Sequence, residues 1–193
     1  AVAATAWSGF WVAGYWGATA GVPAWFEARQ ADGWVAEYQD LSVRGFPSRL
    51  DTTLTGMTLA DPQTGVAWET PFFQFFALTY KPHHLIAVWP HTQTLSIPTQ
   101  KLTIRSADMR ASVIVQPGPT LALDRANLAV KQGEITSTAN WKTAATALNL
   151  AVQKVDDTSA SYQLALQAED LTPPAGFALA SDIDLPRNLS HIR

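Results

Sequence analysis

The chain has 193 residues, of which 47% are apolar, 15% are charged and none is cysteine, and its formal net charge is −3. This length indicates one domain, or one domain with a fragment of another. The lack of cysteine excludes disulfides and thiolate metal sites. The low charge, with no visible basic patch, argues against nucleic acid as a partner.

Residues 1–33 form a helical segment that we expect to act as a membrane anchor or an interfacial helix. Residues 1–20 are apolar and uncharged, and a stretch of this length can span a bilayer; an ordinary buried helix is the alternative. A second helical piece is expected from Pro23 to Ala31, because proline suits the first turn of a helix. The aromatic residues that a membrane or a partner protein would contact here are Trp7, Trp11, Tyr15, Trp16, Trp25 and Phe26.

The pattern changes from helix to strand at a joint around residues 43–51. Residues 34–43 alternate in polarity, which is typical of a strand, and Gly45 and Pro47 then break it. The strand pattern resumes at residue 48, so we expect a hairpin-like reversal with Phe46 tucked beneath it. Three charged residues at the joint suit either the charged edge of a strand or a site for an anionic head group: Arg44, Arg49 and Asp51.

Residues 34–193 predict a β domain built from short antiparallel strands. Apolar or alternating runs recur at intervals of about 8 to 12 residues with proline and glycine between them. No run between them is long enough for the crossover helix that parallel strands require. Residues 140–155 fit both a helical stripe and strand alternation, and their context favours a strand. The sequence therefore predicts a mainly β protein, in which an N-terminal helix is followed by a curved antiparallel meander sheet.

Aromatic residues on both parities of one long run indicate a ligand groove. The run from Val66 to Tyr80, interrupted at Pro71, is apolar on both sides. Such a strand is either buried on both faces or borders a groove. The groove candidates in this run and the next are Phe72, Phe73, Phe75, Phe76, Tyr80 and Trp89.

Catalytic and metal-binding patterns do not emerge from the sequence. His83 and His84 are adjacent, so on a strand they point to opposite faces and do not readily share an ion. No serine lies in a Gly-x-Ser-x-Gly elbow, and there is no glycine-rich phosphate loop. Paired carboxylates occur only beside turns, at 156–157 and 169–170. We therefore predict a protein that is not an enzyme and that has no catalytic residue, no metal site and no cofactor.

Three stretches of the sequence carry a resemblance to a known family. They are Val43-Arg-Gly-Phe-Pro47 with Arg49-Leu-Asp51, the Pro82-His-His84 turn, and Ala107 to Ser112. The chain resembles a family of uncharacterised alphaproteobacterial envelope proteins, domain of unknown function 2125 (DUF2125). Its order of helix, Gly-Phe-Pro motif and meander is also similar to AsmA-type envelope proteins, which are implicated in lipid handling through apolar β-grooves.

The resemblance implies a periplasmic β body, a groove or half-barrel, tethered to the inner membrane by its N-terminus. The family's bodies are longer than this one, and residue 193 ends no element, so we expect the β domain to be truncated at its C-terminus. Two functions follow as hypotheses. The sheet binds or conducts membrane lipid or acyl chains in an apolar groove; alternatively, the chain is an accessory or scaffolding subunit that its tryptophan-rich helix docks onto an integral membrane protein.

Overall fold

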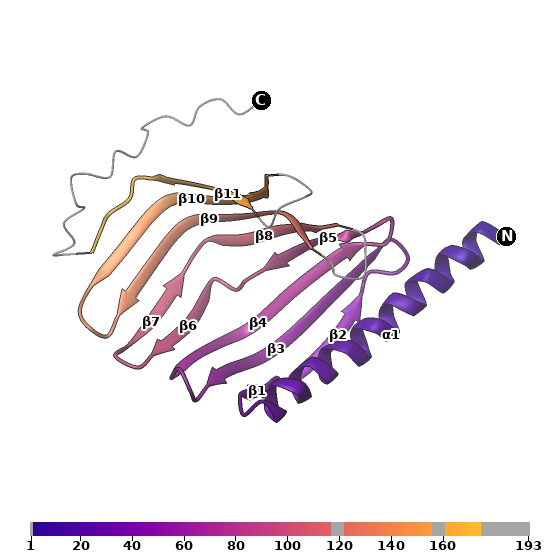
Figure 1. The fold of residues 1–193 in the computed structure, drawn as a ribbon, viewed down its shortest axis with the longest axis horizontal. Coiled ribbons are helices and arrows are strands. Elements are labelled where there is room, and N and C mark those ends of the chain that lie inside the picture. Colours follow the sequence, from indigo (N-terminus) through magenta and orange to yellow (C-terminus); the bar gives the residue numbers. More distant parts are fainter. Residues whose placement is uncertain (1, 117–121, 156–160, 175–193) are drawn as a thin grey trace.

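A computed structural model describes residues 2–116, 122–155 and 161–174, which form one helix and a single large antiparallel sheet. The helix lies along one end of the sheet, and the sheet curves away from it (Figure 1). The rest of the expected β domain, residues 175–193, lies outside the described residues. In chain order the elements are α1 (Val2–Ala31), β1 (Val35–Glu37), β2 (Asp40–Arg44), β3 (Arg49–Asp61), β4 (Val66–Leu78), β5 (Lys81–Val88), β6 (Thr92–Ile97), β7 (Gln100–Arg105), β8 (Asp108–Val115), β9 (Leu123–Ser137), β10 (Lys142–Lys154) and β11 (Tyr162–Glu169).

The sheet is a meander in which long strands run up and down in sequence order. Both β5 and β6 pair with β4, while β7 and β8 both pair with β9. These four strands are therefore the halves of two long strands, interrupted near Pro90 and at residues 106–107. Every strand pair is antiparallel, so the predicted antiparallel meander is confirmed. Residues 140–155, which fitted two patterns, contain strand β10.

The N-terminal helix is continuous over 30 residues, with Pro23 inside it. The expectation of a second helical piece that begins at Pro23 was wrong. A proline removes one helical hydrogen bond, but Val22 and Phe26 on either side of it pack against the sheet core and hold the helix together. Among the residues that the structure describes, no helix combines the length and the apolar character that crossing a bilayer requires.

Two tryptophans fasten the N-terminal half of α1 to the turn between β2 and β3. The Trp7 Nε1–H donates to the Pro47 carbonyl oxygen at 2.8 Å, and the Trp11 Nε1–H donates to the Arg49 carbonyl oxygen at 2.6 Å. Phe46 in the same turn meets the Trp11 ring edge-on at 5.3 Å and is 58% exposed. The expectation that Phe46 is tucked under the reversal was therefore wrong, because the ring lies against the helix from outside.

The buried core sits at the helix end of the sheet. Its fully buried apolar residues within the described chain are Phe26, Ala36, Leu54 and Met57. Leu54 and Met57 are three residues apart, yet both face α1. Gly56 between them has a φ of 57°, a left-handed conformation that glycine adopts at little cost. At Gly56 the alternation of side chains between the two faces of the strand shifts by one residue. The core is thus a wedge between α1 and β3 rather than a layer beneath the whole sheet.

Candidate functional site

One face of the sheet, the one against which α1 packs, is apolar across nearly its whole width. We call it the helix face. The strand registers place two rows of directly opposed residues on it, from β3 through β4, β5, β8, β9 and β10 to β11. The first row is Thr52, Phe75, Ala87, Ala111, Leu128, Leu150 and Leu166, and the second row is Leu50, Ala77, Leu85, Val113, Ala126, Val152 and Leu164. Thr52 is the one polar member.

The opposite face has a different composition. The row that lies between these two in sequence mixes charged, polar and apolar residues: Asp51, Phe76, Ile86, Ser112, Asn127, Ala151 and Ala165. The next row on this face includes Arg110 and Asn149. The sheet is therefore two-sided in the way expected of an antiparallel sheet that has one solvated face.

The helix covers only part of the apolar face. In the described chain, the backbone of α1 lies close to β1, β2 and β3 and to no strand beyond them. Leu54 beneath the helix is 3% exposed, whereas Leu166 and Leu164 at the far end are 59% and 66% exposed. Beyond β3, no member of the two rows is buried. Contiguous apolar surface of this kind marks a ligand, membrane or protein contact site.

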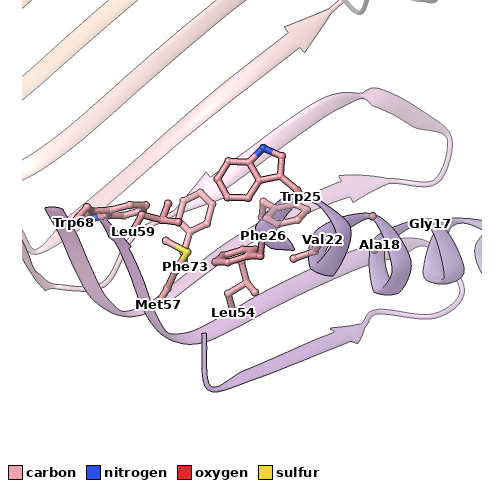
Figure 2. A pocket seen from close by; sticks show the side chains of 12 residues that line it. Gly17, Ala18, Val22, Trp25, Phe26, Leu54, Met57, Leu59, Trp68 and Phe73 are labelled. Atoms are coloured by element: carbon pink, nitrogen blue, oxygen red, sulfur yellow. The ribbon is translucent and has the colours of Figure 1, made fainter. Parts of the chain in front are cut away.

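A groove of about 330 Å³ opens where α1 meets the sheet (Figure 2). The rings of Trp25 and Phe73 and the indole of Trp68 border it, and Trp68 Nε1–H already donates to Gln93 Oε1 at 2.7 Å. On the helix side, Gly17 and Gly21 line the groove, and no atom lies within 4 Å of the position a Cβ would take on either one. The remaining lining residues are Ala18, Val22, Phe26, Leu54, Met57, Leu59 and Phe75.

A second apolar hollow, of about 240 Å³, lies on the same face near β7 to β10. Its apolar lining includes Met109, Val130 and Leu148, which are paired across β8, β9 and β10. The space between the two hollows is bridged by side chains. Phe73 packs on Trp89 with ring centroids 5.2 Å apart, and the buried amide of Gln93 donates to the Met109 sulfur at 3.3 Å. The helix face is therefore mainly apolar from the groove to the far strands, with the buried amide of Gln93 between the two hollows.

The sequence pattern of the family described as "uncharacterized protein conserved in bacteria (DUF2125)" matches residues 11–192. The chain belongs to the DUF2125 family. The match takes in most of α1 and all eleven strands. No curated protein and no solved structure matches the chain.

Three of the six groove candidates lie on the helix face of this DUF2125 protein. Phe73 and Phe75 line the groove beside α1. Trp89 contacts Phe73 and continues the apolar surface toward β8. Phe73 and Phe75 share one parity of the aromatic run, as strand alternation requires.

The other three candidates do not line the groove beside α1. Phe72 and Phe76 fall on the opposite parity and face the other side of the sheet, where the Arg49 guanidinium lies over the Phe76 ring at 5.9 Å. Tyr80 lies in the turn between β4 and β5 and is 59% exposed. Both faces of β4 carry aromatic rings, as expected, but one side alone belongs to the groove.

The aromatic residues of α1 separate into inward and outward groups. Phe26 was expected on a membrane or partner surface; it is 4% exposed and lies in the core of the chain. Trp25 lines the groove. Tyr15 stacks on Trp11 at 5.5 Å. Trp16 points away from the sheet and is 69% exposed.

His84 and His91 both lie within hydrogen-bonding distance of other protein groups. His84 Nε2 lies 2.7 Å from Ser112 Oγ, and His91 Nδ1 lies 3.0 Å from the Ser106 carbonyl oxygen. Within the described ranges, no cluster of three or more histidine, aspartate or glutamate side chains is placed to hold a metal ion. At the joint, Arg49 Nη2 and Asp51 Oδ2 form an ion pair at 2.6 Å along one strand.

A second charged cluster lies where β7, β9 and β10 come together. The Lys142 ammonium lies 2.6 Å from Glu134 Oε2, and Arg105 lies 3.8 Å from Glu134 Oε1. The hydrogen bond from Lys142, with help from its charge, lowers the pKa of the Glu134 carboxyl below its ordinary value. This carboxylate therefore stays charged at neutral pH.

Proposed function

We propose that this DUF2125 protein is a non-enzymatic lipid-binding protein that holds an acyl chain on the helix face of its sheet. One observation carries the proposal: the strand registers align apolar side chains from β3 to β11, and α1 covers only the β1 to β3 end of that surface. The groove beside α1 is the larger of the two apolar hollows on this face, so we assign the acyl chain to it.

The dimensions suit a single acyl chain. Ligand pockets usually hold about 300 to 1,000 Å³, so a groove of about 330 Å³ is at the small end of that range. Neighbouring strands lie about 4.8 Å apart, so the apolar rows extend about 24 Å from β4 to β11. One leaflet of a bilayer is about 15 Å thick in its hydrocarbon part. The face is therefore longer than one chain, which also suits passage of lipid along it.

Placement at the periplasmic side of the inner membrane is part of the same proposal. The first 26 residues carry no charged side chain, and Trp16 is presented on the outer side of α1. A tryptophan on an uncharged stretch of helix is suited to the membrane interface. The helix then holds the opening of the groove next to a source of lipid.

Lipid carried through purification tests the proposal. The protein is purified without organic solvent, and its bound molecules are then extracted and identified by mass spectrometry. We expect acyl lipid in near-stoichiometric amount, because burial of each methylene contributes about 0.8 kcal/mol. A preparation that carries no acyl lipid, and that takes up none when incubated with phospholipid vesicles, would contradict the proposal.

A second candidate function is favoured by the outward side of α1. Val12 and Trp16, which lie one helical turn apart, are exposed there although they are apolar. An accessory subunit would bury this side against an integral membrane protein. In that case the same purification yields a stoichiometric membrane protein instead of lipid, and replacement of Trp16 by glutamate releases it.

A further inference from the structure

The two edges of the sheet differ in how they are protected. On one side the edge is formed by β1 and β2, which have three and five residues, and α1 contacts both of them. Strand β2 begins at Asp40 and ends at Arg44. Short, charged and covered strands are the usual means of preventing a sheet edge from pairing with another chain.

Strand β11 lacks these protections. It has eight residues, pairs in the described chain with β10 on one side, and carries no charge from Tyr162 to Ala168. It contains no proline, and its register with β10 is uninterrupted. Leu164 and Leu166, on the helix face, are 66% and 59% exposed. The outer edge of β11 can therefore form backbone hydrogen bonds with another strand.

The sequence of β11 indicates which strand would pair with it. Residues 163–167 read Gln-Leu-Ala-Leu-Gln, which is the same in both directions about Ala165. Antiparallel pairing of this segment with itself places Ala165 opposite its own copy. Leu164 then meets Leu166 of the second copy, and Gln163 meets Gln167 of the second copy. Each contact joins like with like in size and polarity, and none opposes like charges.

We propose that β11 is a self-association edge, at which two copies of this chain pair antiparallel about Ala165. Such an interface is isologous, with a two-fold axis perpendicular to the sheet. That axis keeps the helix face of both copies on the same side. The leucines at 164 and 166 are covered by those of the second copy, and the apolar rows continue from one copy into the other. The inference does not depend on the acyl ligand, because the pairing uses backbone groups and β11 alone.

A charge-swap experiment on the two glutamines tests the pairing. Gln163 and Gln167 are exposed and lie on the opposite face, where their partners on β10 are Gln153 and Asn149. The molecular mass of the full chain is measured by sedimentation equilibrium over a wide range of concentration. We expect the unaltered protein to dimerise. The double variant Gln163→Glu/Gln167→Glu places carboxylates opposite each other twice across the interface and is expected to dissociate about tenfold more readily.

The swapped variant Gln163→Lys/Gln167→Glu gives the opposite result, because each introduced ammonium then faces an introduced carboxylate of the second copy. We expect it to dimerise at least as tightly as the unaltered protein and to weaken as salt is added. The matched control is Asn149→Glu/Gln153→Glu, which adds the same charges at the same spacing one strand inward and is expected to leave dimerisation unchanged. A wild-type chain that stays monomeric at every concentration would overturn the inference. So would equal dimerisation of the acidic and swapped variants, or a control that dissociates as readily as the acidic variant.

Discussion

Replacement of Phe26 by alanine is expected to lower the free energy of unfolding by about 3 to 5 kcal/mol, the usual effect of deleting a buried phenylalanine. Phe26 is 4% exposed and meets the Tyr38 ring edge-on at 4.8 Å. It joins α1 to Leu54 and Met57, the other large members of the core. Since small domains are stable by about 5 to 15 kcal/mol, the change removes a large share of the total. Urea denaturation followed by circular dichroism measures it.

The matched control for this substitution is Phe10→Ala on the same helix. Phe10 is 48% exposed, so its removal leaves no cavity. We expect the control to lose less than about 1 kcal/mol. Equal losses at Phe26 and Phe10 would show that α1 is not held by the wedge-shaped core described above.

Substitution of leucine for Gly21 is expected to weaken binding of a fatty-acid probe by about tenfold or more. Gly21 lines the groove, and the space where its side chain would begin holds no atom within 4 Å. A leucine there fills part of the groove without forcing the helix from the sheet. Displacement of about two methylenes from the protein costs about 1.6 kcal/mol, which corresponds to more than tenfold in affinity. Titration with a fluorescent fatty acid gives the dissociation constant.

Gly9→Leu is the control for the groove substitution. Gly9 lies on α1, is exposed, and has equally open surroundings, but it does not line the groove. Both variants gain the same helix propensity, so a change in helix stability affects them alike. Unchanged affinity in Gly21→Leu, or an equal loss in both variants, would argue that the acyl chain does not occupy this groove.

Much of the fold can be predicted from the sequence because apolar and polar residues alternate clearly along its strands and its turns carry proline and glycine. The antiparallel meander from Val66 onward is present in the structure, but β4, β9 and β10 are 13 to 15 residues long where short strands were expected. The expectation failed at Pro23, where local preference predicts a helix start. There the packing of Val22 and Phe26 against the core outweighs one missing hydrogen bond.

The candidate site was only half predictable. The aromatic run identified Phe73 and Phe75 but did not separate them from Phe72 and Phe76. Both parities carry phenylalanines, and between residues 72 and 76 one polar residue, Gln74, marks the solvated side. The far part of the apolar face was missed altogether. Leu128, Leu150 and Leu166 belong to three separate alternating strands, and nothing in the linear sequence brings them side by side. Their alignment is a property of the strand register, which depends on turns and bulges along the whole sheet.

The position of a bound acyl chain is the most direct test of the role assigned to the helix face. A fatty acid with a photoreactive group on its chain is bound to the protein and irradiated, and the labelled residues are located by peptide mass spectrometry. We expect labels on the groove residues Trp25, Phe73 and Phe75, with weaker labels along the apolar rows at Leu128 and Leu150. Labels confined to the opposite face, at residues such as Phe72, Phe76 and Ile86, would contradict this role.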